Sequence, residues 1–274
     1  MTLRDTLREI APPILLRTVR SALRRGLRFE GDYPTWQAAQ RASRGYDSEE
    51  IVRRVYEGEL KVKNGTAADA RDGVPFSEMQ FSLPVMAALA RVANARGDGM
   101  RVLDIGGAFG GLYRQFRAFG LRNKVSWTVV EQLAFVKLGV AHFQNAELRF
   151  SAFMDEALAG APADVVLLSS VLQYLPEPHA LIRRIVGWGP GHVVIDRTPC
   201  SALERDVVTV QRVPPEIYRA SYPCWIFSRQ RLLGAFAPVY AALASFTDAS
   251  GAWRSSSASF ELVGFILDRQ PAAA

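Results

Sequence analysis

The sequence is poor in cysteine, and its N-terminal apolar run is short. Its 274 residues include two cysteines, Cys200 and Cys224, too few and too isolated for a disulfide framework or a zinc site. This scarcity fits a reducing environment, and we expect a cytoplasmic protein that needs no metal. The run APPILL is followed at once by arginine, so we expect neither a secretory signal nor a membrane-spanning helix, which needs about 20 apolar residues.

The net charge of +6 is concentrated at one end of the chain. Residues 1–28 contain seven arginines against two acidic residues, so the rest of the chain is almost neutral. Nucleic-acid enzymes usually spread basic charge over a binding face, and we therefore expect no nucleic-acid partner. Apolar and basic residues recur here at helical spacing, which predicts a basic amphipathic helix. Such a helix can contact the inner face of an anionic membrane or pack on its own domain.

Hydrophobic periodicity predicts an α/β fold with a helical N-terminal extension over residues 1–82. The main domain is expected at 83–269, followed by a tail at 270–274. Its strand-like runs lie at 101–105, 125–130, 147–151, 164–169 and 192–196. Helical stretches lie between and after them, at 110–119, 132–143, 178–187 and 228–236. This alternation predicts a mostly parallel sheet covered by helices. Two last runs, 239–246 and 259–269, predict a terminal β-hairpin joined by a polar loop.

The stretch RVLDIGGAFGGLYRQF, residues 101–116, passes from an apolar strand through a glycine-rich turn into a helix. Glycines permit positive φ and remove Cβ atoms, so a ligand can approach the backbone. The N–H groups that open the helix suit an anion, either a pyrophosphate or an amino-acid carboxylate. The Gly-Lys-Ser/Thr of a P-loop is missing.

Two acidic residues accompany this turn. Glu131 ends the second strand about 20 residues beyond the turn, where an acid can hydrogen-bond ribose hydroxyls. Asp104 lies inside the end of the first strand, and a buried acid is costly unless it is paired or hydrogen-bonded. The ammonium group of an amino acid is a suitable partner for it.

These residues carry a family resemblance. Asp104-x-Gly106-x-Ala108-x-Gly110 resembles motif I of class I S-adenosylmethionine (SAM) methyltransferases, although many members have glycine where this chain has Ala108. Glu131 matches their acidic residue at the end of the second strand. ADVVLLSSVLQYLPEP, residues 163–178, is similar to their fourth strand and the following loop. The terminal hairpin matches their seven-stranded sheet, whose last strand is antiparallel.

The whole chain also resembles a family of bacterial methyltransferases of unassigned substrate, through GDYPTWQAA, GYDSEEI, VIDRTP and IYRASYPCWIFS. The resemblance implies a Rossmann-like fold, SAM as the cofactor, and methyl transfer to a small molecule or glycan, with oxygen the expected acceptor atom. It also implies a role in surface-polysaccharide synthesis. An NAD-dependent Rossmann oxidoreductase and a catalytically inactive, membrane-associated scaffold stay open as alternatives, and the oligomeric state is not predicted.

Ligands of open parallel sheets bind beyond the carboxyl ends of the strands, which sorts the candidate residues. The expected cofactor residues are Asp104, Gly106, Gly107, Ala108, Gly110, Glu131, Phe153, Ser169 and Ser170. Phe153 is expected either to pack on adenine or to belong to the core. The expected substrate residues are Gln173, Tyr174, Arg197, Tyr218, Tyr222 and Trp225, of which Arg197 can bind an acidic substrate group through two hydrogen bonds.

Two residues are candidates for a general base. His179 follows the fourth strand at the correct edge, although a surface histidine at a helix start gives the same pattern. Asp196 ends the fifth strand and can act as a base or simply accept hydrogen bonds from backbone amides. The aromatic, proline-punctuated segment 197–230 is too long for a simple connection and is expected to cap the substrate.

Overall fold

The computed structural model describes residues 27–43, 48–97, 99–158, 161–214, 220–237 and 239–271. The predicted basic helix over residues 1–28 lies almost entirely outside the described residues, and so does Tyr218. Among the described residues, no helix combines the length and apolarity that crossing a membrane requires.

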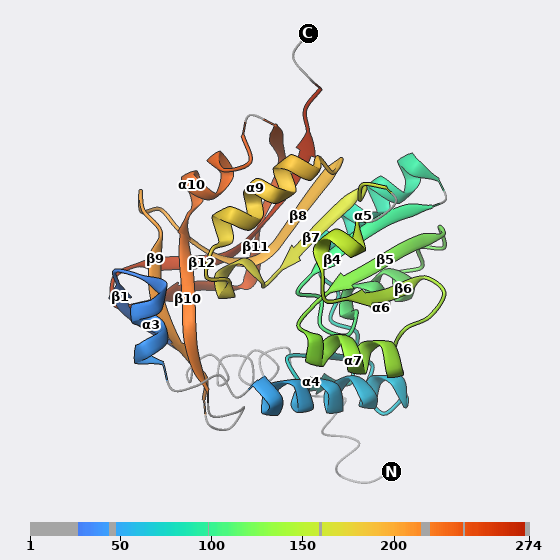
Figure 1. The fold of residues 1–274 in the computed structure, drawn as a ribbon, viewed down its shortest axis with the longest axis horizontal. Coiled ribbons are helices and arrows are strands. Elements are labelled where there is room, and N and C mark those ends of the chain that lie inside the picture. The colour runs from blue at the N-terminus through green and yellow to red at the C-terminus, as the bar shows by residue number, and fades with distance from the viewer. Residues whose placement is uncertain are drawn as a thin grey trace, which may run out of the picture.

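A seven-stranded unit forms the main part of the central sheet (Figure 1). Five neighbouring parallel strands are β6 (Leu148–Ser151), β5 (Val125–Val130), β4 (Met100–Ile105), β7 (Val165–Ser169) and β8 (His192–Ser201). Antiparallel β12 (Ser259–Arg269) pairs with β8, and β11 (Tyr240–Arg254) pairs with β12. The predicted Rossmann-like methyltransferase sheet, mostly parallel with an antiparallel last strand, is therefore confirmed. The polar loop expected between the last two strands is shorter than predicted, because β11 continues to Arg254.

Helices cover both faces of this sheet, because successive strand residues point to opposite sides. On one face, Val102 and Val165 pack with helices α5 (Leu83–Arg96) and α6 (Gly111–Ala118). On the other face, their neighbours Leu103 and Val166 pack with α9 (Pro178–Trp188) and α10 (Arg229–Gly234). The shorter α8 spans Met154–Ala157, and the 3-10 helix η1 spans Leu172–Tyr174.

The segment 197–230, expected to be a cap, forms strands that extend the sheet, and its role as a substrate cap stays a prediction. It contains β9 (Val207–Arg212) and β10 (Ser221–Ser228), which pair antiparallel, and β10 joins β8 over two residue pairs. Strand β1 (Arg28–Tyr33) adds to the outer edge of β9, and α3 (Trp36–Ala42) packs on the same strands. These elements stand to the left of the main sheet in Figure 1. The β-branched run Val207–Val210 explains why this segment forms a strand.

Helix α4 (Ser48–Lys63), in the remaining part of the N-terminal extension, lies below the sheet in Figure 1. It packs against α7 (Leu133–His142) through Val52 and Phe135. A hairpin follows, formed by β2 (Asp69–Arg71) and β3 (Val74–Phe76). The described part of the extension therefore contains two helices and also three strands that the helical periodicity did not indicate.

Candidate functional site

A cavity of about 720 Å³ lies at the carboxyl ends of β4, β5 and β7. This volume is within the range of pockets that bind small molecules and cofactors. Seven of the nine predicted cofactor residues line it: Asp104, Gly106, Gly107, Ala108, Glu131, Ser169 and Ser170. Of the predicted substrate residues, Tyr174, Arg197 and Tyr222 line it too. Ten of the fifteen predicted ligand-binding residues therefore line one cavity.

The glycine turn after β4 is close-packed. Gly106 has φ +75°, and a Cβ there would lie 2.6 Å from Cγ2 of Val171. A Cβ on Gly107 would lie 2.4 Å from Oδ2 of Asp104. A larger side chain at Gly106 would therefore strain the backbone and collide with Val171.

Gly110 lies outside the residues that line the cavity and caps helix α6. It has φ +83° in the left-handed region, and a Cβ would meet Leu148 at 2.9 Å. The next residue, Gly111, begins the helix and does line the cavity. The first turn of α6 therefore offers its N–H groups at the cavity wall.

Asp104 is fully buried, and only one of its two carboxylate oxygens accepts a hydrogen bond. Its Oδ2 accepts a hydrogen bond of 3.1 Å from Nε1 of Trp127, whereas Oδ1 has no partner. Burial raises the pKa of Asp104 to about 7, against the opposing effect of the Trp127 hydrogen bond. A cation placed at Oδ1 would compensate the buried charge and lower this pKa again. The side chain therefore fits the ammonium group of an amino-acid moiety.

Glu131 is the second acid of the cavity. Burial raises its pKa, while hydrogen bonds from the backbone N–H groups of Gln132 and Ala108 act in the opposite direction. The Gln132 contact is 2.7 Å long and uses Oε2. Position and chemistry agree with the predicted role of accepting hydrogen bonds from a ribose.

Backbone strain is concentrated at this cavity. Among the described residues, four non-glycine residues have positive φ: Asp72, Ala108, Ser170 and Arg197. All four line the cavity. Each costs about 1–3 kcal/mol, and such strain persists where the surrounding structure enforces a functional geometry.

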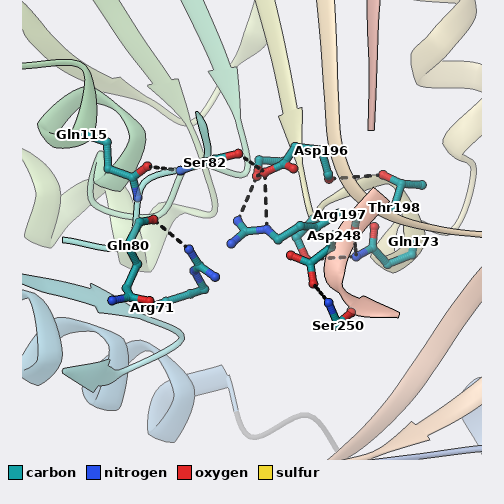
Figure 2. A network of polar contacts seen from close by, with 12 residues as sticks. Arg71, Gln80, Ser82, Gln115, Gln173, Asp196, Arg197, Thr198, Asp248 and Ser250 are labelled. Carbon is teal, nitrogen blue, oxygen red and sulfur yellow. Dashed lines mark hydrogen bonds and ion pairs between the residues drawn. The ribbon is translucent and has the colours of Figure 1, made fainter. Parts of the chain in front are cut away.

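Asp196 belongs to a polar network behind the cavity wall (Figure 2). Its Oδ2 accepts a 2.9 Å hydrogen bond from Oγ of Ser169 and a 3.4 Å one from Oγ of Ser82. Nε of Arg197 lies 3.4 Å from the same oxygen. Asp196 is 4% exposed and is not among the lining residues, so its carboxylate orients Ser169 and Arg197.

The other predicted base, His179, also has a partner outside the cavity. Its Nε2 lies 2.8 Å from Oδ2 of Asp206, and its ring meets that of Phe227 edge-on. Neither base candidate lines the cavity. Within the described ranges, no group of three or more His, Cys, Asp or Glu is arranged to hold a metal ion.

The aromatic wall of the cavity comes from η1, β9 and β10. The hydroxyl of Tyr174 donates to Oε1 of Gln211 at 3.1 Å, and Nε2 of Gln211 donates to the hydroxyl of Tyr222 at 3.4 Å. The two tyrosine rings meet edge-on, 5.3 Å apart. Sequence reasoning missed Gln211, which lines the cavity between them.

Besides Gly110, three of the described residues predicted to bind a ligand lie outside the lining. Gln173 is 2% exposed and donates to Oγ of Ser170, so it supports the loop from behind. Trp225 stacks on Trp36 and donates its indole N–H to the carbonyl of Leu175. Phe153 is 63% exposed, which makes the core interpretation wrong, and its contact with adenine stays a prediction.

Sequence reasoning also missed Arg71, which enters the cavity from the β2–β3 hairpin. Asp72 and Gly73 form the two-residue turn, with φ of +52° and +78°. Asp-Gly in a two-residue hairpin turn with both φ positive is a strong local signal. It fixes the end of β2 and therefore the position of Arg71.

No family model and no curated protein matches the sequence. Among solved structures, the chain is similar to the N-terminal domain of EvdMO1 crystallised with S-adenosylhomocysteine (SAH) and D-fucose, at 20% identity and TM-score 0.47, over 83% of this chain and 100% of that one. It is similar to the 1,6-didemethyltoxoflavin-N1-methyltransferase of Burkholderia thailandensis at 16% identity and TM-score 0.45, over 83% and 92%. The cyclase SpnF is similar at 15% identity and TM-score 0.47, over 89% and 98%. At such identities and scores, function has to come from this chain's own residues.

Proposed function

We propose that this chain is a SAM-dependent methyltransferase acting on a small molecule or a sugar. The observation that carries the proposal is the buried carboxylate of Asp104, with Oδ1 unpartnered at the wall of a large cavity beside a glycine turn. An amino acid's ammonium group fits this position, and the ribose acceptor Glu131 lines the same cavity. A donor that joins a methionine to a nucleoside needs both features together.

Three residues would then each bind a different part of the cofactor. Asp104 would hold the ammonium group, Glu131 the ribose hydroxyls, and the exposed ring of Phe153 would pack on the adenine. When bound, SAM supplies a methyl group on a sulfonium sulfur, and SAH, a neutral thioether, is the leaving group. The chain's own contribution is to align an acceptor atom and to exclude water.

We propose that acceptor positioning is supplied by the wall of Tyr174, Gln211 and Tyr222. Asp196 and His179 already have partners within the protein, so neither is assigned as the base. An oxygen acceptor would favour a general base, and we assign no residue of this wall to that role. The glycan acceptor and the role in surface-polysaccharide synthesis follow from the resemblance alone and stay predictions.

Calorimetry with SAM, SAH and NADH tests the cofactor assignment on the full chain. We expect SAM and SAH to bind in the micromolar range and NADH to give no heat. Binding of NADH without SAH would instead support the oxidoreductase alternative.

A second experiment distinguishes an active methyltransferase from a catalytically inactive scaffold. Radiolabelled SAM is incubated with the protein and a cell-envelope extract, and the glycans are compared by mass spectrometry with and without the protein. Transfer of label to a glycan or small molecule is expected. SAH binding with no transfer to any fraction would support the scaffold alternative.

A further inference from the structure

Two arginines from distant parts of the chain line the cavity. Arg71 ends β2 in the N-terminal extension, and Arg197 lies in β8 with a strained φ of +49°. Both line the cavity. Figure 2 shows their guanidinium groups directed toward the same space from opposite sides.

Arg71 has little compensation within the protein. Its Nη2 donates a 3.1 Å hydrogen bond to the carbonyl of Gln80. No carboxylate among the described residues lies within ion-pair distance of its guanidinium group, whereas Arg114 nearby is paired with Glu59 at 2.6 Å. Burial lowers the pKa of Arg71, and the like charge of Arg197 lowers it further. The charges of Asp72, Asp69 and Asp196 act in the opposite direction without outweighing burial. A buried guanidinium group next to another cation favours an anion.

The guanidinium group of Arg197 is held in place, but not all of its N–H groups are hydrogen-bonded. Its Nη2 donates to Oγ of Ser169 at 2.9 Å, and the Asp196 carboxylate lies 3.4 Å from Nε. That buried Nε has no hydrogen bond. Nε and Nη2 face this network, which fixes the guanidinium plane. Among the described residues no hydrogen bond is made by Nη1, so its N–H groups are the ones that suit recognition of an oxyanion in the cavity.

We propose that Arg71 and Arg197 together bind an oxyanion carried by the acceptor, a carboxylate or a phosphate ester. The acceptor is thus an organic acid whose body packs on Tyr174 and Tyr222. The inference rests on the proposed function only in calling this ligand the acceptor. Arg197 also lies close enough to influence Asp104 electrostatically, so a ligand held by the pair is adjacent to the place assigned to the cofactor.

The test uses simple probes on the full chain saturated with SAH. Benzoate and phenyl phosphate represent the two oxyanions, and benzamide is the neutral control of the same shape. Ligand-observed NMR titrations should show both anions binding in the millimolar range, with benzamide at least tenfold weaker. The stronger of the two anions identifies the acid class.

The variant Arg71→Gln should weaken anion binding about tenfold or more, as expected for a lost charge-assisted hydrogen bond. Its SAH affinity should stay within twofold of wild type. Arg197→Lys keeps a charge beside Asp196 but loses the fork, and it should weaken the anions while the protein still melts cooperatively. Arg149→Gln removes an exposed arginine on β6 and should change nothing.

Three results would overturn the inference. These are equal binding of benzamide and benzoate, no anion binding to the SAH-saturated protein, and loss of SAH rather than anion affinity in Arg71→Gln. The last would mean that the pair binds the cofactor's own carboxylate. If SAH itself fails to bind, the proposed function fails, and the same titrations without SAH still decide whether the pair binds anions.

Discussion

Acidification from pH 8 to pH 6 should weaken SAH binding about tenfold, because Asp104 must be ionised to hold an ammonium group. Burial raises the pKa of this carboxyl to about 7 in the ligand-free protein. About nine tenths of the molecules therefore carry the carboxylate at pH 8 and about one tenth at pH 6. The apparent Kd rises as the inverse of that fraction.

Calorimetric titrations at pH 6, 7 and 8 measure this slope in wild type and two variants. Asp104→Asn keeps the size and removes the charge, so SAH affinity at pH 8 should fall about 10- to 100-fold and the slope should vanish. Glu131 also has a raised pKa, which makes Glu131→Gln the matched control. It should bind more weakly but keep most of the slope, because burial is the main cause of the raised pKa of Asp104 and the Glu131 charge a smaller one. A wild-type affinity that is constant from pH 6 to pH 8, or a slope that survives in Asp104→Asn, would refute this assignment.

The same carboxyl should affect stability with a defined sign. The folded-state pKa of about 7 lies above the ordinary value of 3.8, so the folded protein binds more protons between these values. The contribution of Asp104 to stability is therefore greatest below the ordinary pKa and is lost as the pH rises to 7. The ligand-free Asp104→Asn protein should have a higher Tm than wild type at pH 8, and the difference should shrink at pH 5.

Two further substitutions test the packing around the cavity. Gly107→Ala should weaken SAH binding and lower the Tm, because the new Cβ would lie 2.4 Å from Oδ2 of Asp104. Gly187→Ala, in α9 with nothing within 4 Å of its Cβ, is the control and should be neutral or stabilise by up to about 1 kcal/mol. Trp225→Phe should cost about 1–3 kcal/mol of stability by leaving the Leu175 carbonyl without its indole donor, with SAH affinity within twofold of wild type. A weaker SAH affinity at unchanged Tm would instead place Trp225 in the site.

The main sheet was predictable because its strands are apolar runs bounded by clear breaks. The expected strand 125–130 has the same bounds as β5, and 101–105 differs from β4 by one residue. Strands β9, β10 and β1 were missed for two different reasons. Prolines in the segment 197–230 favoured a loop, although its β-branched run predicts a strand. Strand β1 depends on pairing with β9, a partner about 180 residues away, which local periodicity cannot reveal.

The cofactor half of the cavity was predictable for a topological reason. Parallel strands bring their carboxyl ends to one edge, so Asp104, Glu131 and Ser169 could be placed together from strand order alone. Side-chain pairing was not predictable in this way. Asp196 and His179 end or follow strands at the correct edge, yet Ser169 and Asp206 respectively bind them away from the cavity.

Arg71, which we propose binds the acceptor, does not come from the end of a parallel strand, and the strand-end rule therefore could not predict it. Arg71 is held by a hairpin of the extension, and its only sequence signal is the Asp-Gly turn within the polar stretch AADARDGVPF. Gly73 must stay small as well, because a Cβ would lie 2.9 Å from the carbonyl oxygen of Arg54 in α4. Helix α4 therefore fixes the hairpin, and the hairpin fixes the arginine. Under the proposed function, the sheet would supply the cofactor residues and the extension an acceptor residue, so changes in the extension would alter acceptor choice while leaving Asp104 and Glu131 in place.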